Sequence, residues 1–421
     1  MIDVPAGYKQ TEVGVIPEDW EDVLLDRVAK RGSGHTPDKN HPEYWNGDIK
    51  WISLADSPAL DSLYIDDTFA KVTLEGIANS SAVLHPAGTV VLSRDAGVGK
   101  SAIMRRDMAV SQHFMAWRCG TALDNHYLYY WLQSAKPEFE RIANGSTIKT
   151  IGLPYFKSLK IPHPPLPEQR AIAAALSDVD ALINSLDKLI AKKRDIKQGA
   201  MQQLLTGQKR LPGFNGEGEN VSLGELFTFK NGLNKAKEFF GHGTPIVNYM
   251  DVFRDSKIYC ASIEGRVALS PQEIKNFAVQ KGDVLFTRTS ETPEEIGMAS
   301  VVLDKPYQTV FSGFVLRGRP KNNKLCDQFK SYCFRSEFVR AQIVSKASYT
   351  TRALTNGRIL SAVMLPIPSL PEQTAIAAIL SDMDVEIAAL EQKRDKTRLL
   401  KQGMMQELLT GKIRLNHDSL D

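Results

Sequence analysis

One short stretch carries the residue types of a phosphate-binding loop. Gly99-Lys100-Ser101 follows a short apolar run, and in Walker A loops such a lysine and serine contact nucleotide phosphates and magnesium. The motif also needs a glycine five positions before Gly99, where this sequence has Arg94. Because the phosphate cradle would lack its first tight turn, we do not expect nucleotide binding. A nucleotide-dependent enzyme that uses this loop stays as one alternative function.

Other catalytic and metal-binding patterns are missing. The four cysteines form no Cys-x-x-Cys pair, and no histidine cluster lies near Cys119, Cys260, Cys326 or Cys333. No dinucleotide-binding glycine pattern, methyltransferase motif or nuclease cluster stands out either. We therefore predict no catalytic residue, no metal site and no cofactor bound by this chain. The cysteines are typical of reduced thiols in a cytoplasmic protein, and the lack of a long apolar run predicts no membrane partner.

Several loops carry the residue types that contact bases and phosphates in proteins that bind duplex DNA. Arg, Lys, Asn and Gln on loops can hydrogen-bond base edges, while phosphate contacts position the protein. The loop from Arg94 to Lys100 is the leading candidate, because its glycines permit close backbone approach and cations flank them. A net charge of +3 neither requires nor excludes such a partner. Any single candidate can also be an ordinary solvated side chain, so we rely on the loops as groups.

The candidates fall in both halves of the chain. In the first half, the DNA-binding candidates are Arg31, His35, Arg94, Lys100, Arg105, Arg106, Asn144, Ser146, Thr147 and Lys149. In the second half, they are Asn231, Lys235, Lys237, Arg288, Thr289, Ser290, Tyr349, Thr350 and Arg352.

Two segments of the chain, 166–211 and 370–415, are near copies of each other. They align without a gap at an offset of 204, and 27 of their 46 positions are identical. Each begins Leu-Pro-Glu-Gln, and a proline and a carboxylate suit the first turn of a helix. Near the end of each segment, Thr206-Gly207 and Thr410-Gly411 are common helix stops. About 38 helical residues at 1.5 Å each predict a rod of roughly 57 Å.

Apolar residues recur along both copies with the heptad spacing of a coiled coil. The seam residues are Ile172, Leu176, Val179, Ile183, Leu186 and Ile190 in the first copy and Ile376, Leu380, Met383, Ile387 and Leu390 in the second. Arg394 and Thr397 then interrupt the second seam. One such helix alone would indicate a surface helix or a homodimer zipper. Since one chain holds two, we predict that they pack against each other, antiparallel, with the intervening domains at opposite ends.

The segments before the two helices correspond more weakly. Val90–Arg94 resembles Val284–Arg288, each a short β-type run that ends in arginine. A glycine-containing loop follows each run and is longer in the second segment. Two further pairs of segments match: Gly99–Ile103 with Gly297–Val301, and Trp51–Ser53 with Ile246–Asn248. Each domain is also expected to contain a helical stretch, at Tyr127–Ile142 in the first and at Gln328–Val344 in the second.

These features predict an α+β fold. It has two globular domains of mixed α/β structure, separated by two long helices that form an intramolecular antiparallel coiled coil, with a pseudo-twofold internal repeat. The predicted boundaries are 1–165 for the first domain, 166–211 for the central helix, 212–369 for the second domain and 370–421 for the C-terminal helix and tail. Similar helices with dissimilar domains indicate a fixed frame that carries two different readers, and unlike readers allow an asymmetric target.

The repeated Leu-Pro-Glu-Gln helix start, with a variable domain before each copy, resembles the specificity subunit of type I restriction-modification enzymes. The opening Tyr8–Trp20, with Gly14 and Pro17, also resembles the N-terminus of that family. The resemblance implies that each variable domain is a target-recognition domain for half of a split DNA site. It also implies that the helices set the gap between the halves.

The same resemblance implies the partners. They are double-stranded DNA and two methyltransferase subunits, which bind S-adenosylmethionine and methylate adenine. With two restriction subunits added, which use ATP and Mg²⁺, the complex also translocates and cuts unmodified DNA. The chain itself would perform no chemistry. A coiled-coil scaffold whose domains bind proteins or RNA is the other alternative.

Overall fold

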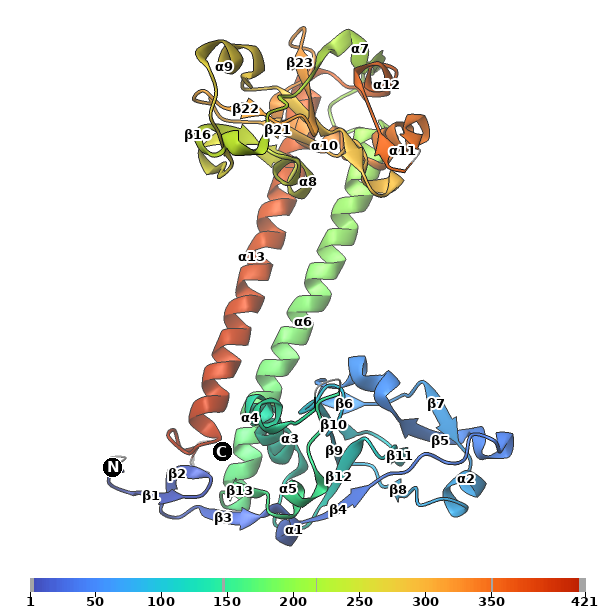
Figure 1. The fold of residues 1–421 in the computed structure, drawn as a ribbon, viewed down its shortest axis with the longest axis vertical. Coiled ribbons are helices and arrows are strands. Elements are labelled where there is room, and N and C mark those ends of the chain that lie inside the picture. Colours follow the sequence, from blue (N-terminus) through green and yellow to red (C-terminus); the bar gives the residue numbers. More distant parts are fainter. Residues whose placement is uncertain (1–3, 146–147, 217, 350, 416–421) are drawn as a thin grey trace. The chain divides into compact units, whose positions relative to one another are not determined.

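The computed structural model describes residues 4–145, 148–216, 218–349 and 351–415, and the chain divides into two compact units (Figure 1). The first unit comprises 1–187 and 393–421, and the second comprises 188–392. Each unit thus holds one globular domain and part of each long helix. Within the described ranges, no helix combines the length and the apolar character needed to cross a bilayer.

The first domain is built on a central five-stranded sheet. Its strand order is β4 (Ala29–Ser33), β12 (Phe114–Cys119), β9 (Val90–Ser93), β10 (Ser101–Met104) and β6 (Tyr64–Ile65). A four-stranded sheet follows the order β7 (Ala70–Val72), β5 (Trp45–Ile52), β11 (Met108–Val110) and β8 (Leu84–His85). Helix α3 (Asn125–Ser134) packs on β9 and β10 (Figure 1).

The second domain repeats this plan. Its five-stranded sheet has the order β15 (Phe227–Asn231), β23 (Val315–Pro320), β19 (Val284–Thr287), β21 (Ala299–Val302) and β17 (Lys257–Ile258). Smaller sheets join β18 (Arg266–Val267), β16 (Phe240–Val247) and β22 (Val310–Phe311), and β20 (Thr289–Ser290), β25 (Ala353–Leu354) and β24 (Ser348–Tyr349). The two matched β-type runs form β9 and β19, the middle strands of the two large sheets.

Short elements complete both domains. In the first they are β1 (Tyr8–Thr11), β2 (Gly14–Pro17), β3 (Glu21–Leu24), β13 (Lys160–His163), α1 (Leu25–Val28), α2 (Leu74–Ala78), α5 (Leu153–Lys157), η1 (Pro42–Tyr44) and η2 (Leu54–Ala59). In the second they are β14 (Glu219–Ser222), β26 (Met364–Ile367), α7 (Leu223–Leu226), α8 (Tyr249–Arg254), α9 (Pro271–Phe277), α12 (Gly357–Ser361), η3 (Lys237–Phe239), η4 (Cys260–Ser262) and η5 (Pro293–Glu295).

The two helical stretches expected inside the domains are each broken. The first is divided between α3 and α4 (Lys136–Ile142), because Pro137 begins a new helical turn after Ala135. The second is divided between α10 (Asp327–Cys333) and α11 (Glu337–Lys346), where the Ser336 side chain caps the new helix.

The long repeats form helices α6 (Leu166–Leu205) and α13 (Leu370–Leu408). In the first unit the early part of α6 lies against the late part of α13, where Asp180 is 2.6 Å from Lys401. In the second unit the late part of α6 lies against the early part of α13, where Lys193 is 2.6 Å from Glu386. The predicted antiparallel packing within one chain is therefore confirmed.

Burial along the helices follows the heptad pattern in part. Ile183, Leu186, Ile190 and Ile387 are buried, while Val179, Met383 and Leu390 are half-buried. The two first positions of each seam belong instead to a domain core. Ile172 and Leu176 pack with Leu408 and Leu409 in the first unit, and Ile376 and Leu380 pack with Leu204 and Leu205 in the second. The seam does not end at its interruption, since Thr397 is buried and Arg394 reaches Asp187 at 3.4 Å.

The glutamate of each Leu-Pro-Glu-Gln start is buried in an ion pair. Glu168 accepts hydrogen bonds from Arg414 at 2.7 and 2.8 Å and from the Trp20 indole at 3.0 Å. Glu372, which is fully buried, accepts from Arg210 at 2.7 Å. Each arginine follows the end of the other long helix, just after a glycine with positive φ, 73° at Gly207 and 71° at Gly411. The start of one helix is thus tied to the end of the other.

The glutamine of each start fastens the helix to the preceding domain. Gln169 accepts from the Asp124 amide at 2.9 Å and donates to the Ala122 carbonyl at 3.0 Å. Gln373 accepts from the Cys326 amide at 2.9 Å and donates to the Lys324 carbonyl at 2.8 Å. In both units the partners are backbone groups, so the contact does not depend on the side chains of the domain.

Candidate nucleic-acid interface

In the first domain, one end of the central sheet gathers several of the predicted DNA-binding residues. Strands β4 and β9 both run antiparallel to β12, so the segments that follow them leave the sheet at the same end. His35 follows β4, Arg94 follows β9, and Lys100 precedes β10 at this end.

The loop with Asn144 and Lys149 joins the same end. The Arg94 carbonyl accepts from the Ile151 amide at 3.0 Å, and Asp95 and Thr150 form a β-bridge. Asn144 and Lys149 are exposed. Loops separated by some 50 positions in the sequence therefore form one surface, which we call the first loop surface (His35, Arg94, Lys100, Asn144 and Lys149).

Three other candidates of the first domain lie elsewhere. Arg105 and Arg106 follow β10 and therefore sit at the opposite end of the sheet. Arg105 lies 4.3 Å above the Tyr64 ring and 3.4 Å from Asp66. Arg31 lies within β4 and pairs with Asp26 at 3.0 Å. Ser146 and Thr147 lie outside the described residues.

The lysine of the glycine-containing loop is already engaged. Lys100 Nζ donates to the Ser57 carbonyl at 3.1 Å, and the Ser101 hydroxyl accepts from Gln133 at 2.8 Å. A Cβ on Gly99 would lie 2.8 Å from the Lys136 side chain, so this glycine serves close packing on α4. Lys100 and Ser101 are thus held by contacts within the domain, and the nucleotide-dependent alternative is not supported.

Arg94 is the cation of this loop with unused hydrogen-bonding capacity. Its side chain is half-buried, with Nε 3.7 Å from Asp95 Oδ1. Among the described residues this buried Nε has no hydrogen-bond partner. The other oxygen of Asp95 lies 2.6 Å from His113 Nδ1. A planar guanidinium beside a carboxylate has further N–H donors that suit an acceptor on a base or phosphate.

The second domain gathers its candidates in the same way. β15 and β19 both run antiparallel to β23, so Asn231 and Arg288 leave the sheet at one end. The Arg288 carbonyl accepts from the Thr355 amide at 3.0 Å, which repeats the contact of Arg94 with Ile151. The small sheet β20–β25–β24 joins Thr289, Ser290 and Tyr349, and we call these residues with Asn231, Arg288 and Arg352 the second loop surface.

The members of the second loop surface differ in exposure. Tyr349 and Arg352 are exposed, and Arg352 lies 3.8 Å from Glu291. Ser290 is buried and donates to Glu295 at 3.2 Å, so its role is internal. Thr350 lies outside the described residues.

The two predicted lysines of the second domain have different surroundings. Lys235 pairs with Glu273 at 2.7 Å and lies 4.5 Å above the Phe239 ring. The Lys235 ammonium and the Ser270 amide and hydroxyl lower the pKa of Glu273 to about 2. Lys237 is exposed in η3.

One residue of the second surface was missed from the sequence. Phe314 is 60% exposed although it lies between buried strands, and with Tyr249 and Arg352 it lines a hollow of about 400 Å³. Its carbonyl accepts from the Arg288 amide at 2.9 Å, and in the first domain His113 makes the same contact with Arg94 at 3.0 Å. The two domains therefore have different side chains, histidine and phenylalanine, at an equivalent backbone position. The sequence signal that could have indicated an exposed Phe314 is the Ser-Gly-Phe turn between two apolar runs.

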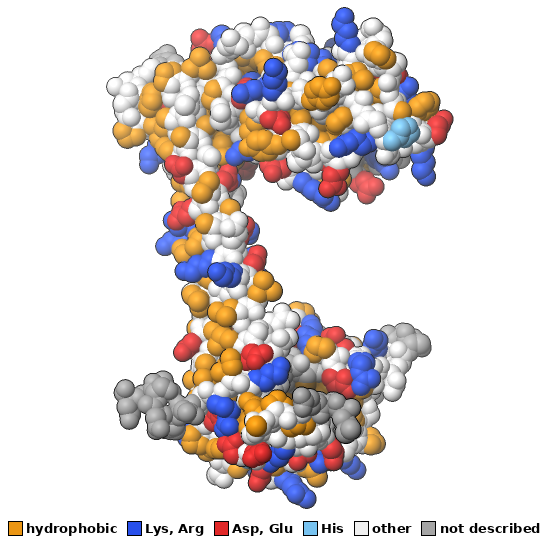
Figure 2. All heavy atoms as spheres, turned by 90° about the vertical axis from the view of Figure 1, so that its left-hand side faces the viewer, with side chains coloured by type: hydrophobic (Ala, Val, Ile, Leu, Met, Phe, Trp, Pro, Cys, Tyr) orange, Lys and Arg blue, Asp and Glu red, His pale blue; other side chains and the backbone are white. Residues whose placement is uncertain are grey.

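Several basic residues of the long helices pair with acidic residues of the other helix. Arg194 contacts Glu391, and Arg398 lies 3.0 Å from Asp187. Figure 2 shows basic and acidic side chains interspersed where the helices are exposed. These ion pairs give basic side chains of the long helices a role in helix pairing.

Comparison with known proteins identifies similar chains. Residues 17–196 and 215–398 match the family described as type I restriction modification DNA specificity domain. The chain is 25% identical over 422 residues to the type I restriction enzyme MjaVIII specificity subunit of Methanocaldococcus jannaschii, covering 96% of this chain and 95% of that one. It is 28% identical over 198 residues to the EcoR124I/EcoR124II specificity subunit of Escherichia coli, covering 45% and 46%.

Solved structures show the same fold. A crystal structure of a type I restriction-modification S subunit from M. genitalium has a TM-score of 0.54 at 17% identity, covering 92% of this chain and 96% of that one. A chain from a study of complex assembly and conformational transition of the type I R-M system has a TM-score of 0.63 at 18% identity, covering 94% and 99%.

Proposed function

Because the chain belongs to the type I restriction-modification DNA specificity family, we propose that it reads a bipartite, asymmetric site in double-stranded DNA, one half-site per domain. It is the specificity subunit of such a system and not an enzyme. We assign the two target-recognition domains to residues 1–165 and 212–369, the central spacer helix to 166–211, and the C-terminal spacer helix and tail to 370–421. Each domain would enter a major groove, with half-site centres roughly 34 Å, or one helical turn, apart.

One observation carries the proposal: the two domains share a backbone plan but not their exposed side chains. His113 and Phe314 occupy the same backbone position beside Arg94 and Arg288. An imidazole can hydrogen-bond a base edge, whereas a phenyl ring offers apolar contact, for example with a thymine methyl group. Such a pair of readers supports an asymmetric target.

We place the base contacts on the two loop surfaces, apart from the buried Ser290. The candidates away from them, including Arg31, Arg105, Arg106, Lys235 and Lys237, suit phosphate contacts, which position a protein without reading sequence. Each loop surface combines a cation with amide, imidazole or aromatic groups, as direct readout requires.

The proposed partners are subunits that supply the chemistry. Two methyltransferase subunits would dock on the helices and carry S-adenosylmethionine. In complexes that also restrict, two further subunits would use ATP and Mg²⁺. We place this assembly in the cytoplasm, where its DNA substrate lies.

The test uses the chain in complex with its methyltransferase partner. DNA is incubated with the complex, and its methylated adenines are mapped by sequencing. The map is made once with the native chain and once with a chain in which Gly218–Ile367 is replaced by a homologous domain. The expected result is a two-part motif of which only one half changes on replacement. If neither half changes, or if the complex prefers RNA to duplex DNA in a salt titration, the proposal is wrong.

A further inference from the structure

The same three-residue contact occurs at the junction of domain and helices in both units. In the first unit, Tyr130 on α3 donates to Asp180 on α6, with Oη 2.9 Å from Oδ2. Lys401 on α13 donates to the same carboxylate, 2.6 Å from Oδ1 and 2.8 Å from Oδ2. One aspartate thus joins the domain, the helix that leaves it and the opposite helix.

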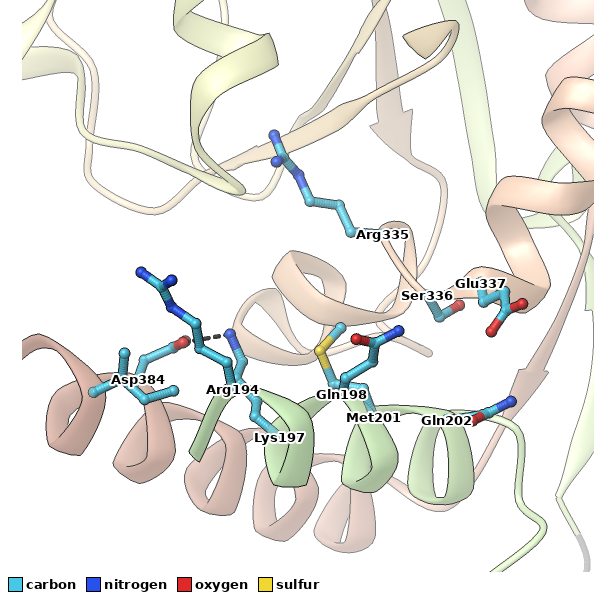
Figure 3. Close-up of a pocket in the computed structure, with 10 residues that line it drawn as sticks. Arg194, Lys197, Gln198, Met201, Gln202, Arg335, Ser336, Glu337 and Asp384 are labelled. Carbon is cyan, nitrogen blue, oxygen red and sulfur yellow. Dashed lines mark hydrogen bonds and ion pairs between the residues drawn. The ribbon is translucent and has the colours of Figure 1, made fainter. Parts of the chain in front are cut away.

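The second unit repeats the contact with the helices exchanged. Tyr332 on α10 donates to Asp384 on α13, with Oη 2.8 Å from Oδ2. Lys197 on α6 donates to the other oxygen of Asp384. Figure 3 shows this pair at the edge of a cavity of about 540 Å³ between α6 and the turn before α11.

The three groups are matched in charge and geometry. Burial raises the pKa of both tyrosines, so each hydroxyl stays protonated and donates at neutral pH. A hydrogen bond to a carboxylate is shorter and stronger than one between neutral groups. Each lysine also lies over the tyrosine ring, 5.3 Å from the centroid of Tyr130 and 5.7 Å from that of Tyr332, within cation–π range.

The tyrosine–aspartate contact differs from core packing because it joins a domain to the long helices. Each tyrosine ring contributes to its domain, but its hydroxyl reaches out to the helix pair. Removing the hydroxyl leaves the ring in place and releases the bond to the helix pair. At Tyr332 it also removes the bond that the hydroxyl accepts from Lys257 of the same domain at 3.2 Å. Tyr129 gives a matched comparison, because its hydroxyl donates to the Asp61 carbonyl at 3.4 Å inside the domain.

We propose that Tyr130 with Asp180 and Lys401, and Tyr332 with Asp384 and Lys197, are positioning residues that fix each recognition domain on the helix pair. They thereby determine the gap length that the complex accepts between its half-sites. This inference rests on the proposed bipartite reading. The residues contact no base and act through the orientation of the loop surfaces.

The test is a gap-length series with the Tyr130→Phe/Tyr332→Phe chain in its methyltransferase complex. Affinity is measured for duplexes that carry both half-sites at the native gap, at one base pair less and at one more, and for duplexes with a single half-site. We expect the preference for the native gap to fall about tenfold, while affinity for a single half-site stays within about twofold. Tyr129→Phe should leave both quantities unchanged.

A variant that keeps the full gap preference would overturn the inference. If the double variant does not fold, Tyr130→Phe alone is measured in the same series and is held to the same outcome. Asp180→Asn should reproduce the loss, because it weakens both bonds to that side chain. A native complex that ignores gap length altogether would instead refute the bipartite function, and this inference with it.

Discussion

The buried carboxylate of Glu168 offers a sharp test of how the two long helices are held. Its side chain accepts from the Trp20 indole and from two nitrogens of Arg414, which follows the end of α13. Glu168 and Asp19 raise the pKa of Arg414, so its charge persists at every accessible pH. Glu168→Gln keeps the shape of the side chain and removes its charge.

The cost of this change can be bounded from the contacts. Removing one partner of a buried ion pair costs about 3–5 kcal/mol. Here the side chain of Arg414 stays 34% exposed and keeps Asp19 at 2.7 Å, and the glutamine oxygen can still accept from Trp20. We therefore expect a loss of about 2 kcal/mol in the free energy of unfolding. With an m-value of about 2.5 kcal/mol/M, the urea midpoint should fall by about 0.8 M.

The tryptophans make the measurement local. All five lie in the first unit, at positions 20, 45, 51, 117 and 131, so intrinsic fluorescence follows the unfolding of that unit. Glu372→Gln is the matched control, since it makes the same change in the second unit. We expect it to shift the fluorescence transition by less than half as much. An unchanged midpoint for Glu168→Gln, or equal shifts for both variants, would refute the reasoning.

Three further predictions concern the helices, the loops and one carboxyl group. Deletion of 183–189 together with 392–398 should preserve the register of the Asp180–Lys401 and Lys197–Asp384 pairs and shift the methylated gap, whereas deletion of 183–189 alone should abolish the bipartite signal. Arg94→Ala and Arg288→Ala should each lower affinity about 10- to 100-fold and relax only their own half-site in a motif map, and relaxation of both halves by either variant would contradict the assignment. The carboxyl of Glu273 should titrate near a pKa of about 2 by NMR. Since this pKa is depressed, the pair with Lys235 stabilises the fold at pH values above the ordinary glutamate pKa, and this stabilisation is lost as the pH falls through the folded-state pKa. An NMR titration midpoint for Glu273 near the ordinary glutamate pKa would contradict the pair.

The long helices were predictable because their signal is local and repeated. Leu-Pro-Glu-Gln and Thr-Gly mark the ends, and the heptad apolar positions mark the face that packs. The partners of the glutamates were not predictable in the same way. Pro167 and Glu168 read as a favourable helix start, yet the carboxylate is held by an arginine 246 positions later. The repeat of Arg210 at Arg414 carried that signal, but only tertiary packing gives it meaning.

The sequence predicted which residue types could contact DNA, but not which of these residues lie together on one surface. The sequence favours the loop with Arg94 but also offers Arg105 as a DNA-binding candidate, and the direction of β10 places the two at opposite ends of the sheet. Lys100 read as an available cation, whereas its ammonium is bonded to the Ser57 carbonyl. Both differences arise from contacts between segments distant in sequence, which residue type and spacing do not encode.

The contacts at the helix starts explain how one frame can hold two unlike domains. Gln169 and Gln373 bond only to backbone groups of the preceding domain, and every sequence provides those groups. Both domains also supply one equivalent side chain to the frame, the tyrosine at 130 or 332, which meets the aspartate and lysine of the helices. A grafted domain should therefore keep the native gap only if it brings a tyrosine to that position. Replacing Gly218–Ile367 with a homologous domain that has phenylalanine there should change the half-site and also relax the gap, and restoring the tyrosine should recover the gap alone. A relaxed gap that persists after restoration would show that other contacts orient the domain.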